Sequence, residues 1–225
     1  MLKLYGCGSP NVFKIQLMLA ETGLDHEFEA VPLLGETLHS EAFRALNPNG
    51  RLPVLVDDGV PIFESGAILL HLAEKTGQFL PAAGNSRDQV FQWLMWQMAG
   101  VGPMFGQALH FRYIAPAGND YASARYSREA ARLYDVAERR LADVPWLAGE
   151  SYSIADIATF PWLGRYAKTL EIDLAERPAV RDWIARIEAR PACQRISAAA
   201  KGLFRADIAA QSAASVEQLD RFFGR

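Results

Sequence analysis

Residues 48–69 of the chain read PNGRLPVLVDDGVPIFESGAIL. Two short apolar runs in this stretch, Leu52–Asp57 and Val60–Phe63, are joined at Asp58-Gly59, a pair that favours a tight hairpin turn. A helical pattern, Ser65–Lys75, follows directly. The stretch therefore predicts two antiparallel strands and then a helix.

Pro53 lies inside the first of these runs, where a proline has no N–H to give to a strand ladder. One alternative is that the run is an edge strand or is broken at this point. The other is a cis Leu52–Pro53 bond, which would turn the backbone N–H and C=O of Leu52 toward a ligand. The sequence leaves both alternatives open.

An acid and a hydroxyl, Glu64 and Ser65, lie where the second run ends and the helix begins. The hydroxyl and amide of Ser65 can hold a carboxylate at the helix N-terminus, and Glu64 can pair with an ammonium group. Together they match the head group of an α-amino acid. The alternative is a simple helix N-cap.

The residues before this stretch alternate between strand and helix patterns. The expected elements are a strand at Leu2–Tyr5, a helix at Asn11–Thr22, a strand at His26–Val31 and a helix near Ser40–Leu46. With the hairpin and the helix that follows it, the order is β-α-β-α-β-β-α. This order predicts an α/β domain in which the first two strands are parallel and the hairpin adds antiparallel strands.

The chain changes character near residue 78. Residues 79–88 lack periodicity and are expected to form a linker between a first domain, 1–78, and an all-α helical bundle, 89–225. Helical spacing recurs at Gln89–Gln107, Tyr121–Ala142, Ile154–Thr169, Pro178–Ala189 and Cys193–Leu203, and Phe204–Arg225 can add one more helix. Ser153 and Asp156 form a capping box, for which we expect a folding role.

The first strand is joined to the first helix by Gly6–Asn11 (GCGSPN). Pro10 suits the first helical position, so Ser9 is the expected N-cap, and a thiolate bound there would be stabilised by the helix N-terminus. Cys7 could itself be the reactive thiol, although the Cys-x-x-Cys spacing is absent. The alternatives are a plain helix start and an inert, buried cysteine.

Composition excludes several classes of function. The net charge of -3 gives no broad cationic field for nucleic acid, and no apolar run is long enough to span a membrane. The N-terminus lacks the pattern of a signal peptide. Because there are only two cysteines, far apart, we expect a cytoplasmic protein without a disulfide framework.

Over nearly its whole length the chain resembles the glutathione S-transferases. The resemblance is carried by the turn at residues 5–11, the Asn-Pro turn followed by Arg51-Leu52-Pro53, the run Phe63–Ile68 and the helical run Tyr152–Ile157. Residues 92–97 (QWLMWQ) and 102–107 (GPMFGQ) are similar to the bacterial Nu-like branch, which is related to the yeast nitrogen regulator with a transferase fold and includes glutathione-dependent disulfide reductases. The resemblance implies a thioredoxin-like first domain, glutathione as co-substrate, and a homodimer that contacts through Ser65–Lys75 and the helix from Gln89.

The resemblance also implies a role for each matching residue. Ser9 and Asn11 would stand near the glutathione sulfur as catalytic residues. The other expected glutathione-binding residues are Leu52 and Pro53 for the cysteinyl part, Glu64 and Ser65 for the γ-glutamyl end, Arg51 for the glycine carboxylate, and Arg125 from the helical domain. The family-like glutamine near position 38 is replaced, since the chain reads Thr37-Leu38-His39 there.

A pocket for an electrophile is expected in the helical domain, where glycines and a proline loosen a helix. Its candidate residues are Phe105, His110, Phe111 and Tyr113, whose rings can form an apolar surface. The alternative for Phe105 and Phe111 is packing in the bundle core. His110 has no metal partner at helical spacing, so no metal site is predicted.

Three functions are consistent with these observations. The first is a transferase that activates the glutathione thiolate for attack on a small electrophile. The second is a glutathione-dependent disulfide reductase, favoured by the Ser-Pro-Asn triplet and by the lack of a tyrosine in the first turn; a variant of it uses Cys7 as nucleophile through a mixed disulfide. The third is a non-enzymatic glutathione-binding or interaction module.

Overall fold

The structure is a computed structural model, and it describes residues 1–224. The chain divides into two compact units, Met1–Leu72 together with the chain from Pro191 onward, and Ala73–Arg190. Among the described residues, no helix is both long and apolar enough to cross a membrane.

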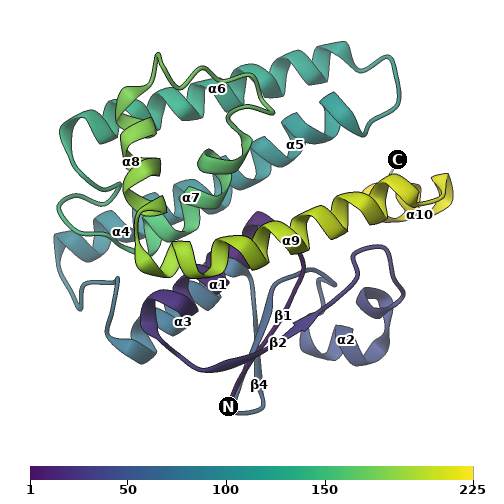
Figure 1. Cartoon of the computed structure of the whole chain (residues 1–225), viewed down its shortest axis with the longest axis horizontal. Coiled ribbons are helices and arrows are strands. Elements are labelled where there is room, and N and C mark those ends of the chain that lie inside the picture. The colour runs from purple at the N-terminus through teal and green to yellow at the C-terminus, as the bar shows by residue number, and fades with distance from the viewer. Residues whose placement is uncertain (225) are drawn as a thin grey trace. The chain divides into compact units, whose positions relative to one another are not determined.

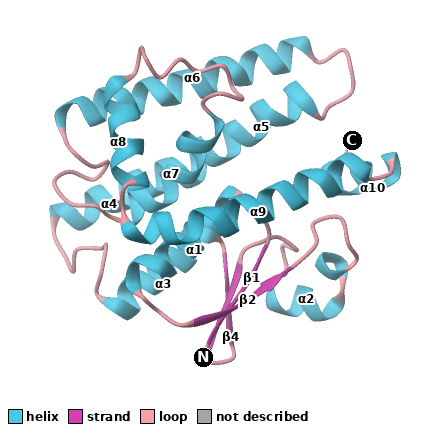
Figure 2. Ribbon diagram, in the orientation of Figure 1, coloured by secondary structure: helices cyan, strands magenta, loops and turns pink. Residues whose placement is uncertain are grey.

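A four-stranded mixed sheet forms the centre of the first unit (Figure 2). Its strands are β1 (Leu2–Gly6), β2 (His26–Ala30), β3 (Val54–Asp57) and β4 (Val60–Phe63), in the order β2-β1-β3-β4. β1 and β2 are parallel, whereas β1–β3 and β3–β4 are antiparallel. The predicted α/β arrangement is therefore confirmed.

Helices lie on both sides of this sheet, with α1 (Pro10–Thr22) and α3 (Ser65–Thr76) on one side and α2 (Glu41–Leu46) on the other (Figure 2). A short 3-10 helix, η1 (Thr37–His39), precedes α2. Beneath α2 a cluster of buried side chains fills the space against the sheet, namely Val31, Leu38, Phe43 and Val54. Burial of these side chains holds the strand ends and the loops beside them in one fixed arrangement.

Local sequence explains where these elements begin and end. The C-cap Gly23 of α1 has a φ of 71°, in the left-handed region that glycine tolerates. Asp58 and Gly59 both have positive φ, which fits a tight hairpin turn between β3 and β4. β3 begins at Val54, two residues later than the sequence predicted, because Pro53 cannot donate to the ladder.

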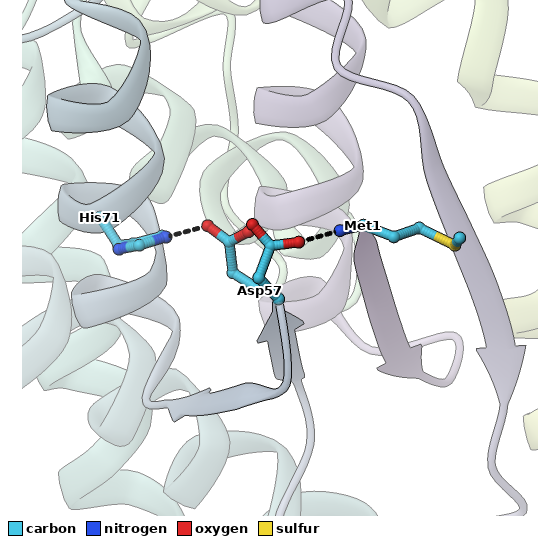
Figure 3. Close-up of polar contacts among 4 residues, drawn as sticks. Met1, Asp57 and His71 are labelled. Atoms are coloured by element: carbon cyan, nitrogen blue, oxygen red, sulfur yellow. Dashed lines mark hydrogen bonds and ion pairs between the residues drawn. The ribbon is translucent and has the colours of Figure 1, made fainter.

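Two polar contacts fix the far end of the hairpin (Figure 3). His71 of α3 lies 2.7 Å from Asp57, measured from Nε2 to Oδ2, and the amino group of Met1 pairs with Asp58. Both contacts tie the end of β3 to neighbouring elements. The hairpin is therefore anchored at its turn, the end that lies away from Pro53.

The helices α9 (Pro191–Ala213) and α10 (Val216–Phe223) belong to the first unit, whereas the sequence had placed them in the helical domain. α9 packs against α1, and Arg195 donates to the carbonyl of Ala20 across 2.8 Å (Figure 1). The backbone of α9 can approach the turn before α1 closely because Gly8 has no side chain. A Cβ added at Gly8 would lie 2.4 Å from the backbone of Phe204.

The second unit is helical. Its helices after the end of α3 are α4 (Asn85–Trp96), α5 (Gly102–Tyr113), α6 (Asp120–Asp143), α7 (Ile154–Tyr166) and α8 (Pro178–Glu188). α4 begins inside the segment expected to be a linker. The helix expected over Gln89–Gln107 is interrupted by a π-helical segment, η2 (Gln97–Val101), directly before Gly102-Pro103. Pro103 has no N–H to continue the hydrogen-bond ladder of α4.

The predicted capping box is present at the start of α7. Asp156 is fully buried and accepts hydrogen bonds from the backbone N–H groups of Leu147 and Ser153 and from the indole of Trp183, at 2.9, 3.0 and 2.9 Å. Burial raises the pKa of Asp156 to about 6, and these hydrogen bonds oppose the rise. Asp156 thus joins three segments of the helical core.

Candidate functional site

The turn between β1 and α1 presents the N-terminus of a helix. Ser9 is its N-cap, with Oγ accepting from the backbone N–H of Val12 at 3.2 Å, and Pro10 is the first helical residue. Asn11 follows in the first turn. Such a terminus favours negative charge, and a thiolate is a suitable anion.

Cys7 lies beside this turn but is buried, with 3% of its surface exposed. Burial raises the pKa of its thiol, and hydrogen bonding with Ser9 only partly opposes this. A thiol in this state is a poor nucleophile near neutral pH because the thiolate is the reactive form. The geometry therefore favours an inert Cys7 over a catalytic one.

Asp207 of α9 contacts the same turn. Its Oδ2 accepts from the backbone N–H of Gly8 at 2.6 Å, and burial raises the pKa of its carboxyl group. An apolar cavity of about 530 Å³ opens beside this contact and is lined by Cys7, Asp207, Pro32, Leu33, Leu203 and Ala210, among others. Asp207 could not be found from the sequence, because 199 positions separate it from Gly8 and no local pattern links them.

The Leu52–Pro53 peptide bond is cis. The loop before it is held by Asn47, whose Nδ2 donates to the carbonyl of Arg51 at 2.7 Å and whose Oδ1 accepts from the backbone N–H of Asn49 at 2.9 Å. This loop leads directly into β3, which begins at Val54. Leu52 and Pro53 are thus placed by side-chain bonds rather than by the sheet.

Glu64 and Ser65 lie beside Pro53, because the register of the hairpin pairs Val54 with Phe63. Glu64 is exposed and has a φ of 69°, a left-handed conformation that costs about 1–3 kcal/mol for a residue with a side chain. Ser65, by contrast, is buried at the first turn of α3. An exposed carboxylate therefore stands next to a helix N-terminus, which suits an ammonium and a carboxylate on one ligand.

A buried cation lies directly behind this pair. Lys14 of α1 is 1% exposed, and its Nζ donates to Oγ of Ser65 at 3.1 Å. Desolvation lowers the pKa of Lys14 to about 7, and the charge of Glu64 opposes this. Lys14 is not among the residues predicted from the sequence, although a lone lysine among Val12, Phe13 and Ile15 on an apolar helix is a signal of a buried charge.

The aromatic candidates of the second unit have different environments. Phe105 is fully buried and stacks on Tyr134, with centroids 5.3 Å apart, which supports core packing for this residue. Phe111 stacks on Tyr126 at 5.4 Å, and His110 packs edge-on against Phe111. Tyr113 is largely exposed, and its hydroxyl donates to the carbonyl of Thr169 at 2.7 Å.

Arg125 of α6 lines a separate cavity of about 370 Å³ in the second unit, together with Arg128, Arg132 and Glu129. Glu129 is paired with Arg132, which lowers the pKa of the carboxyl group. The surface around Arg125 is therefore cationic. Among the described residues, no group of three or more His, Cys, Asp or Glu side chains could hold a metal ion.

Comparisons with known proteins identify the family of the chain. The family "Glutathione S-transferase, N-terminal domain" matches residues 1–74, and "Glutathione S-transferase, C-terminal domain" matches residues 101–191. The chain belongs to the glutathione S-transferase family. The resemblance inferred from the sequence is thereby confirmed.

Three relatives place it further within this family. The disulfide-bond oxidoreductase YfcG of Escherichia coli K12 is 46% identical over 199 residues, covering 85% of this chain and 92% of the relative. A glutathione transferase from Pseudomonas putida, solved with one glutathione disulfide bound per subunit, is 38% identical with a TM-score of 0.80, covering 86% and 89%. The nitrogen regulation fragment of the yeast prion protein Ure2p is 35% identical with a TM-score of 0.79, covering 85% and 93%. The predicted branch is confirmed.

Proposed function

We propose that the protein is a glutathione-dependent disulfide reductase. The observation that carries the proposal is that the first unit combines a helix N-terminus at Ser9 with an amino-acid recognition pair at Glu64 and Ser65, while its own thiol, Cys7, is buried. A site built in this way needs a thiol from a bound ligand. The likeness to YfcG and to a transferase solved with glutathione disulfide favours disulfide exchange over the transferase reaction that the sequence ranked first.

In the proposed reaction, glutathione supplies both reducing equivalents. The thiolate of one glutathione attacks a sulfur of the substrate disulfide, so that a mixed disulfide forms and the other half leaves as a thiolate that takes up a proton. A second glutathione thiolate then attacks the glutathione sulfur of the mixed disulfide. Glutathione disulfide forms, and the second half of the substrate leaves as a thiol. Two glutathiones are oxidised and one disulfide is reduced to two thiols.

The residues of the first unit have distinct roles in this proposal. The helix N-terminus, with Ser9 and Asn11, stabilises the attacking thiolate. The backbone of Leu52 beside Pro53 aligns the cysteinyl part, and Glu64 and Ser65 bind the ammonium and carboxylate of the γ-glutamyl end. Lys14 adds positive charge behind Ser65. These assignments, like those of Arg51 and Arg125, follow from the likeness to the family and from the chemistry of each side chain.

The test is to measure turnover of hydroxyethyl disulfide and of an aryl halide side by side, each with glutathione. We expect the wild-type protein to turn over the disulfide. Ser9→Ala lowers this turnover about tenfold or more, which corresponds to the loss of about one pK unit of thiolate stabilisation. Cys7→Ala, the matched control, changes it by less than about twofold because a buried thiol is inert. Turnover that depends on Cys7 instead of Ser9 would contradict this mechanism.

A transferase reaction is the second candidate, and the apolar cavity of about 530 Å³ beside Cys7 favours it. A cavity of this size and character can accept a small apolar electrophile. Turnover of the aryl halide without turnover of the disulfide would support this candidate. His110, Phe111 and Tyr113 remain candidates for an electrophile surface in the second unit.

We also propose a cytoplasmic homodimer that contacts through α3 and α4, in keeping with the family. Exposed apolar side chains such as Met95 on α4 are consistent with a covered surface. Analytical ultracentrifugation tests this point, since a species of one chain at micromolar concentration would contradict it.

A further inference from the structure

Three arginines converge on one small pocket of the first unit. The pocket has a volume of about 280 Å³ and is lined by Arg44, Arg51 and Arg221, with His39 and Asn49 beside them. None of the described residues that line it is an Asp or a Glu. Such a pocket is suited to an anion, and a planar carboxylate matches the geometry of a guanidinium group.

The position of the pocket indicates which anion it would meet. Arg51 directly precedes Leu52, whereas Glu64 and Ser65 lie beside Pro53 through the pairing of Val54 with Phe63. A tripeptide whose γ-glutamyl end is at Ser65 and whose middle residue is at Leu52 therefore has its C-terminal carboxylate on the side of Arg51. The pocket lies at that end.

Arg221 is brought to the pocket by α10, an element outside the matched family domains, which end at residue 191. Both ends of α10 are well defined: Ser215 and Gln218 form a capping box, and Gly224 ends the helix with a φ of 67°. The helix is held over the loops by two contacts of its last turn. Arg221 pairs with Glu36 at 2.6 Å, and the guanidinium of Arg51 lies over the ring of Phe222, 5.8 Å from its centroid.

We propose that Arg221 is a further binding residue for glutathione, which completes a cationic subsite for its glycine carboxylate. This inference rests on the proposed binding of glutathione at Leu52, Glu64 and Ser65. Arg221 then acts with Arg51 and Arg44 on the charged end of the ligand, and Glu36 holds the Arg221 side chain at the rim of the subsite. The C-terminal helix is thus part of the binding site of this chain.

Calorimetric titration of Arg221→Ala tests the proposal with two ligands, glutathione and its glycine amide, which has the same length but lacks the terminal charge. Arg221→Ala weakens glutathione binding about fivefold to tenfold, as expected for a half-exposed, charge-assisted contact. Binding of the amide stays within about twofold of wild type, since the amide offers no carboxylate to pair with. Arg205→Ala is the matched control, because Arg205 is exposed on α9 and does not line the pocket. It removes one positive charge and changes the affinity for neither ligand.

Each outcome of this experiment has a separate meaning. If wild type gives no heat with glutathione, the proposed function fails. If wild type binds but Arg221→Ala has no effect, or weakens glutathione and the amide equally, the role of Arg221 is overturned while the proposed function stands. Circular dichroism of the variants checks that the fold is retained, which is expected because Arg221 is exposed.

Discussion

Lys14 and Ser65 are hydrogen-bonded inside the first unit, Nζ to Oγ at 3.1 Å, although 51 residues separate them in the chain. Both side chains are buried. A buried ammonium is costly to desolvate, and a packed apolar side chain of similar volume is often as stable or more stable. In keeping with the proposed function, we therefore expect Lys14 to contribute to ligand binding more than to stability.

We accordingly expect Lys14→Met to separate stability from binding. Because methionine keeps much of the apolar stem and removes the charge, the free energy of unfolding rises by about 1–3 kcal/mol. Binding of glutathione weakens about tenfold, since the γ-glutamyl carboxylate loses the positive charge behind Ser65. Urea denaturation and calorimetry measure the two effects, with Lys201→Met as control, since the Lys201 side chain of α9 is exposed. A variant that is less stable and binds as wild type would contradict this account.

The same lysine predicts a dependence of stability on pH. The pKa of Lys14 is about 7 in the folded protein, whereas the pKa of an exposed lysine is 10.5. Between these values the unfolded chain binds more protons, so the contribution of Lys14 makes the free energy of unfolding rise with pH from about 7 to about 10.5. Urea denaturation at several pH values shows this slope in wild type, and the difference between the wild-type and Lys14→Met curves isolates it. If the free energy of unfolding depends on pH in the same way in wild type and in Lys14→Met, the lowered pKa of Lys14 is refuted.

Asp156 holds the core of the second unit, and Asp156→Ala should be strongly destabilising. Removal of the carboxylate leaves the N–H groups of Leu147, Ser153 and Trp183 without their acceptor, a loss of about 3–5 kcal/mol in total. Asp143→Ala, at the exposed end of α6, is the matched control and changes stability by less than about 0.5 kcal/mol. Thermal unfolding of both variants is the measurement. Equal melting temperatures would show that the capping box contributes little.

Substitution of Gly8 tests how tightly α9 packs on the turn between β1 and α1. In Gly8→Ala the added methyl meets the backbone of Phe204, so either the turn or α9 must shift, at a cost of about 1–3 kcal/mol. Gly202→Ala in α9 is the matched change with open space around it, and it stabilises the helix by about 0.5–1 kcal/mol. Amide hydrogen exchange in α9 should accelerate in the first variant only. Acceleration in neither variant would argue against the close approach.

The sequence predicted the first unit up to α3 well because its signals are local. Gly23 and Asp58-Gly59 impose left-handed conformations, Pro10 begins a helix, and the apolar runs between them have the period of strands or helices. Glu64 and Ser65 stood out for the same reason, and their role in binding stays a prediction. Each of these features depends on neighbours within a few residues.

Features that depend on distant contacts could not be predicted. Asp207 meets Gly8, and Arg221 meets Glu36, only because α9 and α10 return to the first unit, and helical periodicity does not say which surface a helix covers. Lys14 was passed over because it lies within an apolar helical pattern, and its partner is on another element. The break at Gly102-Pro103 was read as a loosened helix, whereas the structure has a π-helical segment before it.

The central claim is that Glu64 and Ser65 recognise the γ-glutamyl head of glutathione and so bring its sulfur to the start of α1. Calorimetric titration with glutathione of wild type, Glu64→Gln and Ser65→Ala tests it most directly. The account predicts a single saturable heat for wild type and affinities at least about tenfold weaker for both variants. Undiminished affinity in both variants, or no heat with wild type, would contradict it.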